Sequence, residues 1–260
     1  MKAVTIAVVN YQTPDLTRLC LRSLHKFTNL ERVRVVVIDN NSKDDSIDYL
    51  RNLDWIELVE RPSVPGETPP ESHSRALDIG LGKADTPYFF VMHTDTLMVH
   101  DGWLDYLIGE IEKNDRIAGV GSWKMEIESP IKTIGQKIET FVREKILQRK
   151  SRRHRSQYLR SHGALYRTAL LKEHTSGFCD GDTAGKSAHF RLTDAGFTMR
   201  FLPVRILNRY MRHLNHATMI LNPEISGRNT GTPKARKRIQ EELNNIGFKE
   251  ILNDDKLDKI

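Results

Sequence analysis

The chain has 260 residues, of which 38% are hydrophobic and 28% charged, which fits one globular domain or one domain with an appendage. The two cysteines, Cys20 and Cys179, are too few and too far apart for a disulfide framework or a CxxC metal knuckle, which favours a reducing compartment. Because no apolar run approaches the ~20 residues of a spanning helix and no signal-peptide pattern opens the chain, we expect a cytoplasmic protein, soluble or peripheral to a membrane.

Apolar runs alternate with helical patterns from the first residues onward, which is typical of βαβ units around a parallel sheet. The apolar runs predict buried strands over residues 3–9, 33–38, 56–59, 88–92 and 117–120. Helical spacing predicts the intervening helices, one after Thr13-Pro14 and others near residues 47–53, 72–83 and 103–111. The proline-rich segment 61–71 is predicted to be an extended loop at a ligand mouth.

The regular alternation fades after about residue 122. A long helix is predicted over residues 131–149, and a short apolar patch follows at residues 163–166. The charged tail from residue 232 to 260 has apolar residues at helical spacing, so it is predicted to be a partly docked helix.

The net charge of +6 is concentrated in one basic strip, residues 143–160, which holds eight Lys or Arg and one acid. One interpretation is a solvated helical face or loop. The other is docking on an anionic membrane surface or a phosphorylated acceptor, since Ile146, Leu147, Tyr158 and Leu159 interleave apolar groups with the charges. Without an RNP-like motif or a zinc finger, nucleic acid is not an expected partner.

Polar side chains follow three of the predicted strands. They are Asn10 and Tyr11 after the first, Asp39 to Ser42 after the second, and His93 to Asp95 after the fourth. Ligands of such sheets bind beyond the carboxyl ends of the strands, so these clusters are predicted to share one edge. Neither GxGxxG nor GxxxxGK[ST] occurs, which disfavours dinucleotide dehydrogenases and P-loop NTPases. There remains a nucleotide site built from carboxylates, with a divalent cation covering the diphosphate.

From residue 3 to about 205 the sequence resembles the family 2 glycosyltransferases of the GT-A fold. The segments that carry the resemblance are VTIAVVNYQTPDLTRLCLRSL, VVVIDNNSKDDS, FFVMHTDTLMVHDGWLDYL, GALYRTALL and LTDAGF. The resemblance implies an α/β fold with a Rossmann-like, mostly parallel sheet flanked by helices. It implies a nucleotide-sugar-binding half over residues 1–121, an acceptor-binding half over 122–222 and a helical tail over 223–260.

The implied activity is transfer of a sugar from a nucleotide-diphosphate sugar to a hydroxyl of a polysaccharide or a lipid-linked glycan, with inversion and with help from a divalent metal, Mn²⁺ or Mg²⁺. In this resemblance Asp39 contacts the nucleoside, with Asn10 and Tyr11 lining the same pocket. Arg75 matches a position that reaches the diphosphate, and Asp95 matches the metal-binding acid of a D-x-D triplet.

The chain departs from the family pattern at two places. His93 stands where the triplet begins with aspartate, which favours Mn²⁺ or another transition ion over Mg²⁺. A late histidine motif offers another ligand, for which we select His216 over His213.

The second departure concerns the catalytic base, because Ala184 and Gly185 occupy the places of the expected acidic pair before Arg191. An inverting transfer needs a carboxylate that takes the acceptor proton, and Asp182 is predicted for this role with Asp180 beside it.

Structural roles remain open for each of these residues. The alternative role of Asp39 is to cap a turn, and that of His93 is to pack at the end of a strand. The pair His213 and His216 is alternatively structural, and the acids at 180 and 182 are alternatively turn formers. Two other functions are therefore weighed. One is a non-catalytic module that binds a nucleotide sugar or glycan on the same fold. The other, a nucleotidyltransferase, is disfavoured because residues 10–13 contain no glycine.

Overall fold

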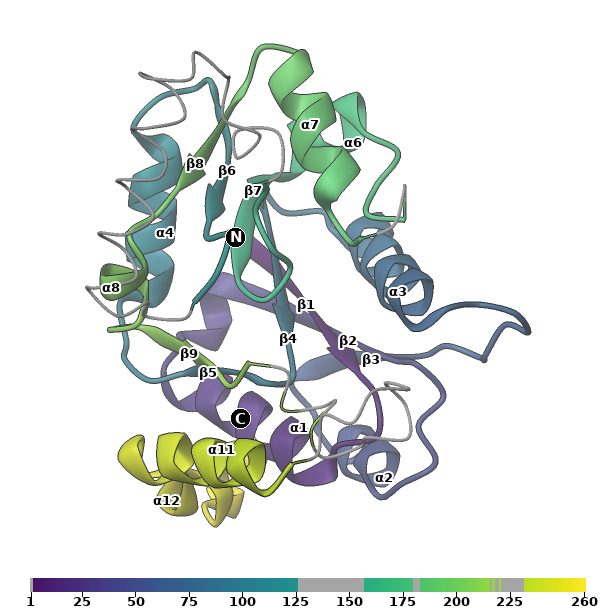
Figure 1. The fold of residues 1–260 in the computed structure, drawn as a ribbon, viewed down its shortest axis with the longest axis vertical. Helices are drawn as coiled ribbons and strands as arrows, with labels where there is room; N and C mark the ends of the chain where they lie inside the picture. Colours follow the sequence, from purple (N-terminus) through teal and green to yellow (C-terminus); the bar gives the residue numbers. More distant parts are fainter. Residues whose placement is uncertain (1, 126–156, 180–182, 216, 218–219, 221–231) are drawn as a thin grey trace.

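A seven-stranded sheet forms the centre of the molecule, with its strands in the order β3 (Ile56–Glu60), β2 (Val33–Asp39), β1 (Val4–Asn10), β4 (Tyr88–His93), β7 (Ala164–Arg167), β6 (Ile117–Gly121) and β8 (Thr198–Phe201) (Figure 1). The computed structural model describes residues 2–125, 157–179, 183–215, 217, 220 and 232–260. The strands from β3 to β4 pair in parallel, and β8 runs parallel to β6. Only β7 among the described strands of this sheet opposes its neighbours.

Helices cover both faces of this sheet (Figure 1). The helices within the described residues are α1 (Pro14–Lys26), α2 (Ser46–Arg51), α3 (Pro69–Lys83), α4 (Trp103–Glu112), α6 (Thr168–His174), α7 (Lys186–Asp194), α8 (Val204–Leu207), α11 (Pro233–Asn245) and α12 (Phe248–Leu252), with short 3₁₀ turns at Leu30–Arg32 and Asp255–Asp258. The predicted strands and the predicted α/β fold are confirmed, each strand to within a residue or two at its ends.

Two hydrophobic cores lie on opposite faces of the sheet because side chains alternate along each strand. In β1, Ile6 and Val8 face the core shared with α1, α4 and the tail, whereas Ala7 and Val9 face the core shared with α3, α6 and α7. All four side chains are buried, which explains why the sequence of a parallel strand reads as a continuous apolar run.

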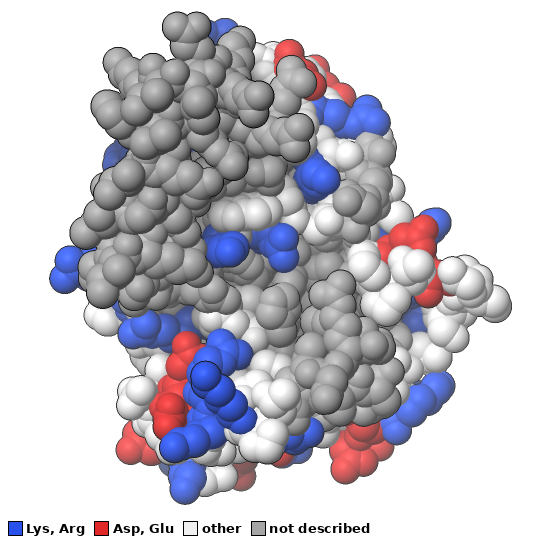
Figure 2. All heavy atoms as spheres, viewed as in Figure 1, with Lys and Arg blue, Asp and Glu red and all other residues white. Residues whose placement is uncertain are grey.

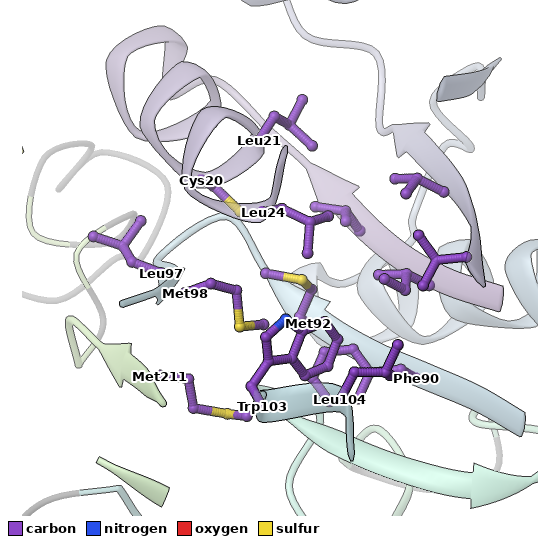
Figure 3. Close-up of a cluster of buried hydrophobic side chains, with 14 of the residues drawn as sticks. Cys20, Leu21, Leu24, Phe90, Met92, Leu97, Met98, Trp103, Leu104 and Met211 are labelled. Carbon is purple, nitrogen blue, oxygen red and sulfur yellow. The ribbon is translucent and has the colours of Figure 1, made fainter. Parts of the chain in front are cut away.

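A second, two-stranded sheet joins β5 (Thr96–Met98) to β9 (Met211–His213) in antiparallel register. Met98 and Met211 extend from one face of this two-stranded sheet toward Trp103 in the first core (Figure 3), and Leu97 joins the same core from the other face. We call this pair of strands the β5–β9 ribbon. It was not predicted, because each strand has three residues and the two are more than a hundred residues apart in the chain.

The start of α3 corrects the prediction of an extended loop to residue 71. The helix begins at Pro69, since Thr68 and Glu71 form a capping box in which each side chain bonds the other's backbone N–H. Proline at the first helical positions costs no hydrogen bond, because those N–H groups have no partner within a helix. The prolines therefore start the helix instead of preventing it.

The C-terminal tail is docked as predicted. Ile239 of α11 is buried in the first core, and Asp258 pairs with Arg22 of α1 while accepting a hydrogen bond from Tyr49. None of the helices in the described ranges is long and apolar enough to cross a bilayer.

Most of the basic strip and the predicted helix over residues 131–149 lie outside the described residues. At the end of the strip, Tyr158 and Leu159 are 3% and 0% exposed. They pack inside the protein, which corrects the interpretation of these two side chains as part of an interfacial surface.

Candidate functional site

The carboxyl ends of three adjacent parallel strands bring the predicted site residues to one edge of the sheet. Asn10 at the end of β1 is the register partner of Asp39 at the end of β2. On the other side, Val9 is the partner of His93 at the end of β4, two residues before Asp95. Residues separated by as many as 85 positions therefore meet at the edge where ligands of such sheets bind.

Asn10 and Asp39 form a buried hydrogen-bond network. The amide of Asn10 donates to Asp39 Oδ1 at 2.7 Å, and the backbone N–H of Ser42 donates to Asp39 Oδ2 at 2.9 Å. The side-chain amide of Asn10 also donates to the hydroxyl of Ser46 at 2.9 Å. This network gives Asp39 the turn-forming role that the sequence also allowed. Each carboxylate oxygen retains a second lone pair for a ligand.

Among the residues that the structure describes, three other than glycine adopt positive φ, and all three follow strands at this edge. They are Gln12 after β1, Asn41 after β2 and Asn215 after β9, with φ of 46°, 61° and 46°. Such backbone is uncommon and costs of order 1 kcal/mol or more per residue, so its concentration at one edge is typical of a functional site.

Asp95 lies at the centre of an acid and imidazole cluster. Its Oδ1 is 3.2 Å from Nε2 of His213 and 3.6 Å from Nδ1 of His93. The other oxygen, Oδ2, accepts a hydrogen bond from the backbone N–H of Ala217. Oδ1 is buried and has no hydrogen bond of acceptable geometry within the described chain, even though two ring nitrogens are close.

Asp95 and His213 shift each other's pKa. Burial acts to raise the pKa of Asp95, but the nearby imidazole of His213, followed by that of His93, outweighs it and holds that pKa well below its usual value. Burial likewise acts to lower the pKa of His213, and the Asp95 carboxylate overrides it, so that this pKa is raised. The cluster therefore carries an ionised carboxylate in a place closed to solvent.

The arrangement suits a divalent metal ion. His93, Asp95 and His213 each offer one donor atom, and these atoms lie within 4.8 Å of one another. Donor atoms that share one cation at about 2.1 Å stand roughly 3 to 4 Å apart, which matches the two distances from Asp95 Oδ1. The unpartnered oxygen of Asp95 completes the fit, because a cation gives it the partner that the protein does not.

Sequence reasoning selected His216 over His213 as the late ligand. His213 is the residue that lies against Asp95, because β9 pairs with β5 and places it opposite Thr96. His216 lies outside the described residues, so its role stays a prediction. His213 is favoured because it belongs to strand β9. A strand of three residues leaves no recognisable pattern in the sequence.

A second layer of side chains supports the cluster, and sequence analysis did not find it. The hydroxyl of Ser161 is 2.9 Å from Nε2 of His93 and 3.4 Å from Nε2 of His73 on α3. Burial, followed by the neighbouring His93, lowers the pKa of His73 to about 3, so this ring is neutral. On the other side His162 stacks on His213 with 4.6 Å between ring centroids.

Arg75 and Tyr11, two further predicted donor-binding residues, lie in α3 and directly after β1. Nε of Arg75 is 3.0 Å from the carboxylate of Glu67, and the arginine side chain is 56% exposed. The structure therefore gives Arg75 a protein partner near the start of α3. Tyr11 is half-buried directly after Asn10, at the same strand end.

The predicted bases Asp180 and Asp182 lie outside the described residues. The segment before them is anchored to α3, because the backbone N–H groups of Phe178 and Cys179 both donate to the carboxylate of Asp78. Gly177 has a φ of +97°, and a Cβ there would come within 2.2 Å of that carboxylate, so this anchor requires glycine.

Comparison with known proteins agrees with this geometry. A family model described as glycosyl transferase family 2 matches residues 5–175. A curated relative from Haemophilus influenzae, described as an uncharacterized glycosyltransferase, is 26% identical over 111 residues, which are 42% of this chain and 33% of the relative. The chain thus matches about a third of that relative's length.

Solved structures share the fold. A mannosyltransferase from Pyrobaculum calidifontis in complex with GDP-Man and Mn²⁺ has a TM-score of 0.55 and 16% identity, with 77% of this chain and 54% of that chain covered. TarS 1–349 from S. aureus in complex with UDP-GlcNAc has a TM-score of 0.51 and 18% identity, with coverage of 74% and 53%. Glucosyl-3-phosphoglycerate synthase from Mycobacterium tuberculosis has a TM-score of 0.53 and 16% identity, with coverage of 95% and 80%. At these identities the likeness shows the expected GT-A fold.

Proposed function

Because the chain belongs to glycosyl transferase family 2, we propose that it transfers a sugar from a nucleotide-diphosphate sugar to a hydroxyl group of a polysaccharide or a lipid-linked glycan. The observation that carries this proposal is the common edge. The Asn10–Asp39 network and the Asp95 cluster lie at the ends of adjacent strands, as a site for a nucleoside and its diphosphate requires.

Recognition of the donor is assigned to the first of these groups. The free lone pairs of Asp39 accept hydrogen bonds from the base or ribose, and the Asn10 amide holds the carboxylate in place. Two solved structures of the same fold contain GDP-Man and UDP-GlcNAc, which supports a nucleotide-sugar donor. Arg75 is proposed to exchange its ion pair with Glu67 for the donor diphosphate, which a guanidinium fork suits well.

The second group is proposed to hold the metal. His93, Asp95 and His213 are its ligands from the described chain, with His216 proposed as a further one. When bound, the cation neutralises the charge that develops on the departing nucleoside diphosphate. Imidazole nitrogens favour transition ions, so Mn²⁺ is proposed over Mg²⁺. A solved structure of this fold contains Mn²⁺, which supports the choice.

The transfer itself needs a base on the acceptor side. In the proposed inverting reaction the acceptor oxygen forms a bond to the anomeric carbon while the bond from that carbon to the diphosphate oxygen breaks. The acceptor proton passes to a carboxylate, proposed as Asp182 with Asp180 as the neighbouring candidate. Asp78 anchors the segment that leads to both acids.

A donor panel tests the proposal. UDP-, GDP-, dTDP- and CMP-sugars are incubated with the protein and Mn²⁺, and release of the nucleotide is measured with and without glycan acceptors. We expect turnover of at least one donor, abolished in Asp95→Asn and retained in Asp101→Asn, whose side chain is 84% exposed. Tight nucleotide binding without any turnover would overturn transfer and identify the chain as a binding module.

A further inference from the structure

A groove of about 620 Å³ lies on the face of the β5–β9 ribbon opposite the Asp95 cluster, which consists of His93, Asp95 and His213. Its lining comes from the end of β5, from α8 and the turn after it, from β9 and from the end of α11. The lining residues are Val99, Arg205, Asn208, Arg209, Arg212, Asn245 and Ile246. We call it the arginine groove. Figure 2 shows a group of Lys and Arg side chains over α11, with Asp and Glu side chains beside it.

The positions of the arginines follow from the local fold. Arg205 belongs to α8, and Arg209 follows in the turn that leads to β9. Arg212 is the middle residue of β9, between Met211 and His213, which face the core and the metal cluster. Because side chains alternate along a strand, Arg212 points to the opposite side of the ribbon.

The charge of this groove is uncompensated by the described residues. Its lining contains three guanidinium groups and no acid. Within the described chain, Arg205, Arg209 and Arg212 have no ion pair and no side-chain hydrogen bond, whereas Arg22, Arg34, Arg51, Arg61 and Arg200 each bond a carboxylate. Three like charges that line one groove repel each other, and an anion bound in the groove reduces that repulsion.

The chemistry of the lining identifies the kind of anion. Guanidinium forks match the paired oxygens of a phosphate, and three of them can surround one phosphate group. Asn208 uses its amide nitrogen to bond the Met125 carbonyl, which leaves its carbonyl oxygen to accept a bond from a ligand hydroxyl. The volume is within the usual range for an organic ligand and much larger than inorganic phosphate needs.

We propose that the arginine groove binds an organic phosphate, such as a sugar phosphate or one unit of a phosphodiester-linked polymer, without a metal ion. The site is separate from the donor edge, because the β5–β9 ribbon stands between Arg212 and the Asp95 cluster. It goes beyond the proposed transfer reaction and does not depend on it.

Calorimetric titration of the full chain with ribose 5-phosphate in EDTA tests the proposal. EDTA removes divalent ions, so binding at the Asp95 cluster does not contribute. We expect saturable binding that weakens about tenfold for each of the substitutions Arg205→Gln, Arg209→Gln and Arg212→Gln, and that falls steeply with added salt. Arg212→Lys keeps the charge and loses the fork, so it should weaken binding less than Arg212→Gln.

A matched triple variant controls for net charge. Lys2, Arg116 and Lys256 are exposed residues without a side-chain partner in the described chain, and their replacement by Gln should leave binding unchanged. Arg205→Gln, Arg209→Gln and Arg212→Gln are also combined in a groove triple variant. Nucleotide binding with Mn²⁺ should survive in that variant, which shows that it is folded. Absence of binding by the native chain, or equal loss in both triple variants, would overturn the proposal. Binding to phosphatidylglycerol vesicles without binding to ribose 5-phosphate would replace it with a membrane surface.

Discussion

His213 and Arg212 are consecutive residues of β9, and they belong to opposite kinds of surroundings. His213 lies against an ionised carboxylate with its side chain 9% exposed, and its position is fixed by Asp95, by the ring of His162 and by the pairing with β5. Arg212 faces a hollow with two other arginines and no partner in the described chain. One side of the ribbon is held by contacts within the protein, whereas the other leaves its charge for a ligand.

This difference between the two faces of the ribbon predicts whether a substitution changes protein stability or ligand binding. A buried carboxylate is stable only when its neighbours compensate the loss of water, so removal of any neighbour should be felt by the others. Unpaired arginines at a surface retain their water, so their removal should change ligand binding and leave stability almost unchanged.

Asp95→Asn is expected to have the largest effect on this comparison. The amide keeps the shape of the side chain and removes the charge that holds both imidazoles, so Mn²⁺-dependent binding of a nucleoside diphosphate should weaken by ~100-fold or more. Calorimetric titration with and without Mn²⁺ measures the loss, with Asp101→Asn as the exposed control. Unchanged Mn²⁺-dependent binding would remove Asp95 from the metal site.

His213→Ala should weaken Mn²⁺ affinity by about 10- to 100-fold, since one ligand is lost and the Asp95 charge loses its partner. His174→Ala, at a histidine outside the cluster, should have no effect. His216→Ala tests whether there is a fourth ligand, because weaker Mn²⁺ affinity in this variant would identify His216 as one. A loss in His216→Ala with none in His213→Ala would reverse the roles that the structure indicates.

Ser161→Ala should have a smaller effect, about tenfold on Mn²⁺ affinity. Its hydroxyl lies 2.9 Å from Nε2 of His93 and 3.4 Å from Nε2 of His73, so it holds the His93 ring with Nδ1 directed toward Asp95. Ser161→Thr retains a hydroxyl and should restore most of the affinity. Equal affinities in the native, Ala and Thr proteins would show that Ser161 does not orient the ring.

Asp258→Asn should have the smallest effect, because it leaves both faces of the ribbon intact and loosens the tail. Burial acts to raise the pKa of Asp258, while its hydrogen bonds to Arg22 and Tyr49 outweigh this and lower it below 3.8. The carboxylate therefore contributes stability above its ordinary pKa, and this contribution is lost as the pH falls through the lowered value. We expect a loss of about 1 kcal/mol in the free energy of unfolding at pH 7, with a smaller difference below about pH 4.

Chemical denaturation at several pH values measures this difference. Asp255→Asn, in the same 3₁₀ turn, provides an exposed control. A difference between native protein and Asp258→Asn that grows toward low pH would contradict the sign of the shift.

The sheet and the edge where the candidate site lies were predictable from local patterns. Buried parallel strands read as apolar runs, and polar residues after those runs mark the ligand edge, which located Asn10, Asp39, His93 and Asp95. These inferences need no contact between distant segments beyond the order of the strands.

The partners of Asp95 were harder to predict because they come from long-range pairing. His213 meets Asp95 through a three-residue strand that pairs with β5, and a run that short has no reliable pattern. Ser161 and His73 come from a loop and a helix that periodicity treats as scaffold. The start of α3 is a different case, since the Thr68 to Glu71 capping signal was present and the surrounding prolines outweighed it in the interpretation.

Anomalous diffraction at the manganese absorption edge tests the central claim most directly. Crystals grown with Mn²⁺ and a nucleoside diphosphate should show one strong peak within about 2.5 Å of the Asp95 carboxylate and of a ring nitrogen of His93 or His213. A manganese peak held by other residues, with none at Asp95, would contradict the account.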